Sequence, residues 1–111
     1  MLDDALRAIA EPRRRKILRL VSGKELTVGQ IAARFEVTRP AISQHLRVLE
    51  NAGLVQVRQQ GTRRFYRGRP EGLAELREYL ELFWDERLAA LKAAAEEQER
   101  ADTQEIGRAH V

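Results

Sequence analysis

The chain has 111 residues, which is enough for one domain with a modest hydrophobic core. Cysteine is absent and no apolar run approaches the ~20 residues that cross a bilayer, so disulfides, thiolate metal ligands and a membrane-spanning helix are excluded. The net charge of +3 is uneven, because residues 1–70 carry 15 bases against 6 acids, whereas residues 71–111 carry 5 against 11.

Two short helices are predicted at the start of the chain. Apolar residues recur at helical spacing in the first one, at Leu2, Ala5, Leu6 and Ile9. The second begins near Pro12, which is tolerated in a first turn, and stops at Gly23. It carries five bases, some of which we expect to contact phosphates while the others are solvated: Arg13, Arg14, Arg15, Lys16 and Arg19.

A helix-turn-helix is predicted next. Thr27 and Gln30 form a Thr-x-x-Gln capping box, which starts a third helix. After a short break at residues 35–37, Thr38 can cap a fourth helix that runs to Ala52. Two helices joined by a short turn are the arrangement that places a recognition helix in the major groove of DNA.

The two faces of this predicted recognition helix differ in chemistry. At 100° per residue, Ile42, Leu46 and Leu49 fall on one apolar stripe of the helix. His45 adjoins this stripe, so a half-buried packing role is favoured for it over base readout. The opposite face is short, polar and cationic, and it suits base edges and phosphates. The residues of this face that we expect to contact DNA are Thr38, Arg39, Pro40, Ser43, Gln44 and Arg47. Thr38 would also cap the helix.

A β-hairpin is predicted after the recognition helix. Residues 54–59 alternate between apolar and polar side chains, as a half-buried strand does. Residues 60–62, Gln-Gly-Thr, form a turn, and residues 63–67 make the returning strand.

This hairpin is strongly basic, with no acid between Glu50 and Glu71. A ribbon of this kind predicts a wing, Arg58–Arg67, that lies along the phosphate backbone or in a minor groove. Arg63 and Arg64 are the expected DNA contacts, and because they alternate faces we expect only one of them to reach DNA squarely. The basic first part of the chain fits a polyanion partner, although two solvated surfaces that happen to differ would have the same composition.

A long amphipathic helix is predicted after Pro70. Its large apolar residues recur with a period of about 3.6 residues, at Leu73, Leu76, Leu80, Phe83, Trp84, Leu88 and Leu91. The apolar stripe of a helix this long is larger than so small a domain can cover, so we expect the helix to pack against its counterpart in a homodimer. The alternative is that the helix lies across its own domain. The predicted interface residues are Leu6, Leu76, Leu80, Phe83, Trp84 and Leu88. Residues 1–98 would then form a DNA-binding and dimerisation domain, and residues 99–111 a frayed or disordered tail.

These elements make a mainly α fold with a two-stranded β-hairpin, which is a winged helix-turn-helix with a long C-terminal dimerisation helix. The ordered motifs at residues 26–32, 41–49, 52–55 and 60–66 resemble the ArsR/SmtB family of bacterial repressors. The resemblance covers Ala5 to about Ala95. It implies a homodimeric, sequence-specific regulator that binds double-stranded DNA and is expected to repress transcription.

The resemblance raises the question of a metal site, because the family is known for metal-sensing repressors. Many members have a Cys-x-Cys pair where this chain has Thr27 and Gly29, and others use Asp and His on the last helix, where this chain has Asp85 and Glu86 but no His. Zinc and similar metals prefer imidazole nitrogen or thiolate sulfur. We therefore expect no metal site and no cofactor.

Residues 84–88 resemble those of a metal-free subgroup of the ArsR/SmtB family, in which the last helix simply closes the dimer. Trp84 is accordingly interpreted as a core or dimer anchor, in preference to the lining of a pocket for an organic effector, whose identity is unknown. Two alternative functions remain: a winged-helix module that binds a protein, and a metal-responsive repressor with a non-standard site.

Catalysis and export are not expected. No nucleophile with a positioned base is visible, and there is no Gly-rich phosphate loop. The first residues, Met1 to Asp4, lack the basic and apolar regions of a signal peptide. The expected setting is therefore the cytoplasm, without a membrane partner.

Overall fold

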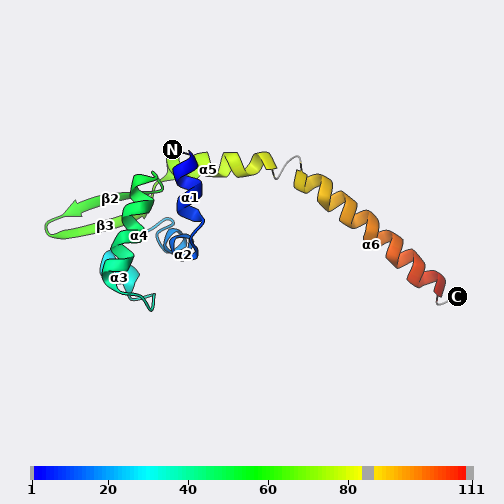
Figure 1. The fold of residues 1–111 in the computed structure, drawn as a ribbon, viewed down its shortest axis with the longest axis horizontal. Coiled ribbons are helices and arrows are strands. Elements are labelled where there is room, and N and C mark those ends of the chain that lie inside the picture. Colours follow the sequence, from blue (N-terminus) through cyan, green and yellow to red (C-terminus); the bar gives the residue numbers. More distant parts are fainter. Residues whose placement is uncertain (1, 84–86, 110–111) are drawn as a thin grey trace. The chain divides into compact units, whose positions relative to one another are not determined.

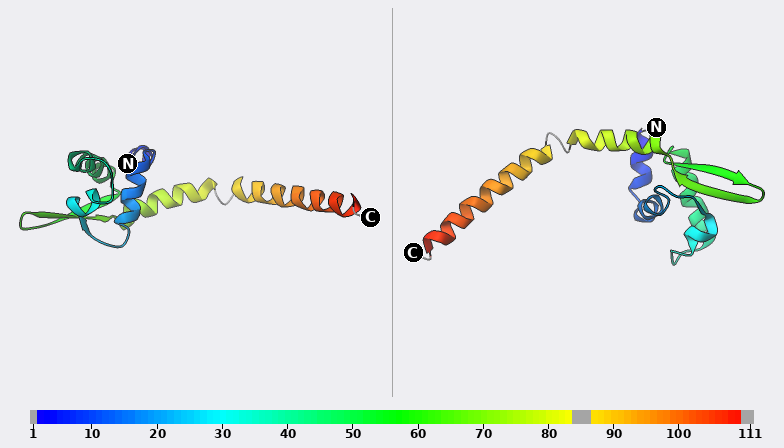
Figure 2. Two further views of the ribbon diagram at one scale, coloured as in Figure 1. Left: turned by 90° about the horizontal axis from the view of Figure 1, so that it is seen from below. Right: turned by 180° about the vertical axis from the view of Figure 1, so that it is seen from behind.

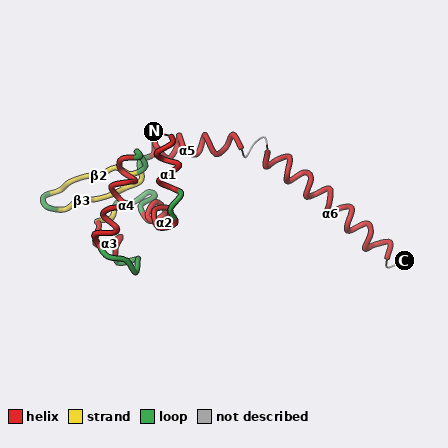
Figure 3. The backbone as a smooth tube through the Cα atoms, in the orientation of Figure 1, coloured by secondary structure: helices red, strands yellow, loops and turns green. Residues whose placement is uncertain are grey.

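The computed structural model describes residues 2–83 and 87–109, with side chains described to residue 102. These residues fall into two compact units, Met1–Arg77 and Glu78–Val111. Figure 1 labels the elements along the chain, and Figure 3 distinguishes helices, strands and loops. None of the described helices is both long and apolar enough to cross a membrane.

The first unit is a winged helix-turn-helix, as the sequence predicts. Its elements in chain order are α1 (Leu2–Ile9), α2 (Pro12–Leu20), β1 (Leu26–Thr27), α3 (Val28–Ala32), α4 (Arg39–Asn51), β2 (Val55–Gln60), β3 (Arg63–Gly68) and the first half of α5 (Pro70–Phe83). The strands form one antiparallel sheet in the order β1-β3-β2. The tip of the β2–β3 hairpin projects beyond the helices of this unit (Figure 2).

The third strand was not predicted. Leu26 and Thr27 of β1 pair with Tyr66 and Phe65 of β3, so the sheet has three strands where the sequence indicated a two-stranded hairpin. Two residues are too few to show the alternation by which a strand is recognised, and their pairing partners lie about 40 residues away. The strand therefore depends on a tertiary contact.

A single core holds these elements together. Its largest members have no exposed surface and come from α2 and its C-cap, from α3 and α4, and from the residue before β2: Ile17, Val21, Ile31, Ile42, Leu46, Leu49 and Leu54. Complete burial of each such side chain is worth roughly 1.5–3 kcal/mol. The core thus fixes the recognition helix against the rest of the unit.

The second unit consists of the end of α5 and helix α6 (Ala89–Ala109). Helix α5 ends at Phe83 and α6 begins at Ala89. The sequence predicts one helix through Leu91, and residues 84–86 of that prediction lie outside the described residues. Helical backbone extends to Ala109, into the segment 99–111 for which the sequence predicts fraying.

Candidate nucleic-acid interface

Helix α4 has the limits that the sequence predicted for a recognition helix. Thr38 is its N-cap, and the Thr38 hydroxyl accepts a hydrogen bond from the backbone N–H of Ala41 at 3.3 Å. Pro40 occupies the first turn, where its missing N–H is not needed. Ala52 is the C-cap, and Gly53 follows with φ of 76°, the left-handed conformation that ends a helix.

The two faces of α4 are separated as predicted. Ile42, Leu46 and Leu49 are completely buried. All of the residues expected to contact DNA are exposed, namely Thr38, Arg39, Pro40, Ser43, Gln44 and Arg47. This face carries two guanidinium groups, one amide and two hydroxyls, which are groups that pair with phosphates and base edges.

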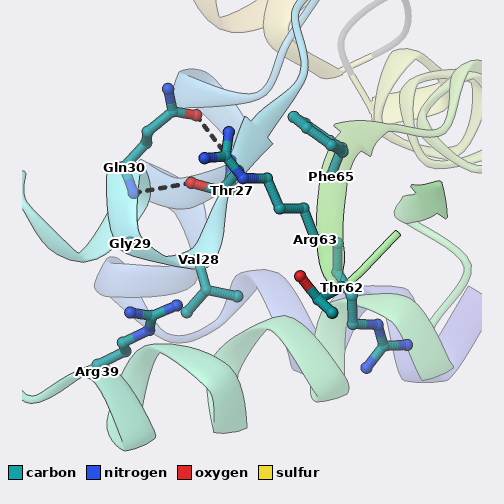
Figure 4. Close-up of a pocket in the computed structure, with 9 residues that line it drawn as sticks. Thr27, Val28, Gly29, Gln30, Arg39, Thr62, Arg63 and Phe65 are labelled. Carbon is teal, nitrogen blue, oxygen red and sulfur yellow. Dashed lines mark hydrogen bonds between the residues drawn. The ribbon is translucent and has the colours of Figure 1, made fainter. Parts of the chain in front are cut away.

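Helix α3, which packs against α4, begins with a complete capping box. The Thr27 N–H donates to Oε1 of Gln30 at 2.8 Å, and the Gln30 N–H donates to the Thr27 hydroxyl at 3.2 Å (Figure 4). These bonds satisfy two donors at the start of the helix. The sequence predicted both.

A cavity of about 570 Å³ lies between α3, the start of α4 and the wing (Figure 4). Three arginines from two different elements line it: Arg39 comes from α4, and Arg63 and Arg64 come from β3. The guanidinium of Arg39 lies beside Gly29 of α3. An open, cationic cavity with this lining is suited to a segment of phosphate backbone.

The sheet register places Arg63 and Arg64 on opposite faces of the wing. Arg64 shares the face of Tyr66, which is 6% exposed and packs into the core. Arg63 shares the opposite face with Phe65. Both arginines are exposed, and which of them contacts DNA stays a prediction.

Arg58 differs from the other wing cations. The sequence predicts that Arg58 belongs to the basic wing, but in the structure its guanidinium pairs with Glu25, the residue before β1. Hydrogen bonds from Arg58 and its positive charge lower the pKa of Glu25. Hydrogen bonds to Glu25 and its negative charge in turn raise the pKa of Arg58. No local spacing could have revealed this pair, because the two residues are 33 positions apart.

Several bases of α2 are also engaged inside the protein. Arg14 donates from Nε to the carbonyl of Ala8 at 2.6 Å and from Nη2 to that of Arg7 at 3.2 Å, and Arg15 donates to the carbonyl of Ile9 at 2.7 Å. The carbonyls of Ala8 and Ile9 lie at the end of α1, where the helix itself supplies no donor, whereas that of Arg7 also accepts from the backbone N–H of Ala10 at 3.2 Å. The expectation that bases of α2 contact phosphates therefore loses support for Arg14 and Arg15.

His45 packs as the sequence predicted. Its side chain is half-buried, and Nδ1 lies 3.5 Å from Nη1 of Arg14. An arginine nitrogen can only donate, so this geometry suits an imidazole whose Nδ1 is the acceptor. The histidine links α4 to α2, and its half-buried position is confirmed.

Comparison with known proteins identifies the family. Residues 11–57 match the model of the arsR family of bacterial regulatory proteins. The chain is also 48% identical over 82 residues to the HTH-type transcriptional regulator Rv2034 of Mycobacterium tuberculosis, an alignment that covers 74% of this chain and 77% of the relative. The chain belongs to the ArsR family. This agrees with the resemblance seen in its motifs.

Solved structures of ArsR-family regulators share this fold. A protein described as a possible transcriptional regulator for arsenical resistance matches with a TM-score of 0.73 and 48% identity, over 82% of this chain and 95% of the other. The homodimeric winged helix-turn-helix DNA-binding domain Mb0332 of Mycobacterium bovis matches with a TM-score of 0.60 and 34% identity, over 78% and 83%. The winged helix-turn-helix assignment is thereby confirmed.

The metal question can be asked of the described residues of this ArsR-family chain. Among the side chains that the structure describes, in residues 2–83 and 87–102, no three His, Cys, Asp or Glu residues are grouped so that they could hold a metal ion. Asp85 and Glu86, on the predicted last helix, lie outside the described residues, as does Trp84.

The predicted dimer residues fall into two sets. In the first unit, Leu76 is 7% exposed and belongs to the core, and Leu6 is half-buried against it. In the second unit, large apolar side chains are exposed: Leu80 at 47%, Phe83 at 47% and Leu88 at 39%. Leu82 and Leu91, each 63% exposed, are further exposed apolar side chains of this unit that the predicted interface set does not include.

Proposed function

We propose that this ArsR-family protein is a homodimeric, sequence-specific DNA-binding regulator that represses transcription from the sites it occupies. The observation that carries the proposal is the exposed polar and cationic face of α4 beside an arginine-lined cavity that opens between α3 and the wing. Residues 1–98 would form the DNA-binding and dimerisation domain. The proposal places the protein in the cytoplasm and involves no catalytic step.

Roles within the interface follow from the chemistry of each side chain. Ser43, Gln44 and Arg47 lie on the exposed side of α4 and would pair with base edges in the major groove. Thr38, Arg39 and Pro40 form the start of the helix and would meet the backbone that borders the groove. Arg63 and Arg64 would hold the wing on a flanking phosphate or in the minor groove.

The dimer would form through the apolar side chains of the second unit. Leu80, Phe83 and Leu88 are exposed in the isolated chain, and a helix that shows such residues to water gains stability by burying them. A second copy is the natural occupant, because a two-fold dimer presents two recognition helices to half-sites about 10 base pairs apart, or a multiple of that. Leu6 and Trp84 remain proposed members of this interface.

Two alternatives make different predictions. A winged-helix module that binds a protein would protect no DNA and show little dependence on salt. A metal-responsive repressor would release DNA when stoichiometric zinc is added. The proposed function leaves the effector of this protein open.

The test is a selection of binding sites from random double-stranded DNA, followed by footprinting and a salt titration. We expect one preferred sequence with two symmetric half-sites, and an affinity that falls steeply as salt rises because phosphate contacts release counterions. Sedimentation of the complex should give two protein chains per site. Selection of no sequence, together with salt-independent binding to a protein partner, would overturn the proposal.

A further inference from the structure

Arg58, in β2, forms a forked ion pair with Glu25, which precedes β1. The Arg58 Nε lies 3.1 Å from Oε2 and 3.2 Å from Oε1 of Glu25, and Nη2 lies 2.7 Å from Oε2. The remaining nitrogen, Nη1, donates to Oε1 of Gln60 at 2.8 Å. Every nitrogen of the guanidinium therefore has an acceptor within the protein, which leaves fewer of its N–H groups for a phosphate.

Phe65 belongs to the central strand β3, which lies between β2, the strand of Arg58, and β1, the strand that follows Glu25. The register sets Arg58 of β2 opposite Phe65 of β3, and it sets Thr27 of β1 opposite Phe65 from the other side. The Arg58 guanidinium lies over the Phe65 ring, 4.6 Å from its centroid. The side chain thus passes across the central strand and reaches the start of β1, so that this one contact links all three strands.

The pair lies where support for the wing ends. β1 pairs with Tyr66 and Phe65, so the β3 residues nearer the tip, Arg63 and Arg64, have β2 as their only neighbouring strand in the described part of the chain. An isolated two-stranded hairpin is marginally stable in water. The outer half of the wing therefore depends on whatever fixes it at the level of Phe65.

We propose that Glu25 and Arg58 are positioning residues for DNA binding, whose ion pair, stacked on Phe65, holds the outer half of the wing at the angle at which Arg63 and Arg64 meet DNA. The inference rests on the proposed DNA-binding function. It separates the wing arginines into two kinds, one that holds the wing and one that contacts the nucleic acid.

The direction in which DNA affinity changes when Glu25 is neutralised tests this inference. An acid that merely lies near DNA repels it, so neutralising that acid strengthens binding. An acid that holds the wing does the opposite, because its loss leaves a mobile wing whose ordering must be supplied on binding. The lowered pKa of Glu25 keeps the pair ionised at neutral pH.

The experiment measures the affinity of the full-length dimer for its selected DNA site by fluorescence anisotropy. We expect Glu25→Gln and Arg58→Met each to weaken binding by roughly threefold to tenfold, more than a simple exposed pair provides because this one is forked and stacked. The double variant should bind DNA at least as tightly as the single variant with the lower affinity. The exchanged pair, Glu25→Arg with Arg58→Glu, should recover part of the loss.

Glu36→Gln is the matched control, since Glu36 is an exposed acid of the same unit, in the turn before α4. It should bind DNA as tightly as the wild type or more tightly. If Glu25→Gln behaves in the same way as this control, the proposal is overturned and Arg58 is better described as a phosphate contact.

A second measurement does not require DNA. Hydrogen–deuterium exchange of the free protein should be faster in Glu25→Gln at residues 59–64, with exchange in α4 unchanged, because only the outer wing loses its support. Equal exchange in variant and wild type would refute the positioning role. A wild-type protein that binds no DNA would instead overturn the proposed function, and the exchange result would still decide whether the pair holds the wing.

Discussion

Gly72, at the start of α5, lies directly against the backbone carbonyl of Gly53, with no room between them for a β-carbon. Gly53 is the left-handed residue that follows the recognition helix. The contact is reinforced by Arg69, whose backbone N–H donates to the carbonyl of Leu54 at 2.9 Å and whose Nη1 donates to that of Gly53 at 3.4 Å. The first turn of α5 is therefore held against the C-terminal end of α4.

Gly72→Ala should lower the free energy of unfolding by about 1–3 kcal/mol, because the added methyl group overpacks against backbone that cannot rotate away. Urea denaturation measures the change. Gly29→Ala is the control, since a β-carbon at Gly29 makes only an ordinary contact with Arg39, and alanine favours the helix. It should leave stability unchanged or raise it by up to about 1 kcal/mol. Equal effects of the two substitutions would contradict the close contact at Gly72.

Arg14→Met should destabilise the protein by about 1–2 kcal/mol, since it removes the donors to the carbonyls of Ala8 and Arg7. Because Arg14 is engaged internally, the slope of DNA affinity against salt should not change. Arg13→Met, at an exposed position of the same helix, should leave stability nearly unaltered. A salt slope reduced by about one in Arg14→Met would show that Arg14 is a phosphate contact after all.

Glu11 should make stability depend on pH. Desolvation acts to raise its pKa, but the backbone N–H groups of Arg14 and Arg13 at the start of α2 outweigh that effect and lower the pKa below its ordinary 4.5. Its contribution is therefore present above that value and is lost as the pH falls through the lowered pKa. The difference in Tm between wild type and Glu11→Ala, followed by circular dichroism, should be largest at neutral pH and narrow below about pH 4. A difference in Tm that stays constant with pH would argue against a stabilising charge on Glu11.

Leu80→Asp should give a monomer, because it places a carboxylate within the apolar surface that is proposed to bury itself against a second copy. Sedimentation equilibrium measures the mass directly. Ala74→Asp adds the same charge to α5 at an exposed position away from that surface, and it should remain dimeric. A Leu80→Asp protein that is still dimeric would remove this part of α5 from the interface.

Arg47→Ala should cost about 1–3 kcal/mol of binding free energy at one base position of the site, which is the loss expected for one bidentate base contact. Binding to a panel of single-base variants measures it. Arg39→Ala should weaken all of these sequences alike, because a phosphate contact carries no sequence information. If Arg47→Ala also weakens every sequence equally, Arg47 holds the backbone and reads no base.

Helix ends and helix faces were predictable from the sequence because their partners are close along the chain. The Thr27 and Gln30 capping box and the Thr38 cap each join residues three positions apart. The burial of Ile42 and Leu46 follows from the 3.6-residue period in the same way. The ordered set of these local signals was enough to indicate the ArsR family.

The winged helix-turn-helix and the exposed face of its recognition helix could therefore be inferred from local patterns. Which basic residues are engaged inside the protein could not be inferred, because it depends on contacts that form on folding. Arg14, Lys16 and Arg58 donate to partners 6, 18 and 33 positions away, and β1 exists only because it meets β3. Neither charge nor spacing can reveal such partners, since folding alone brings these distant groups within hydrogen-bonding distance.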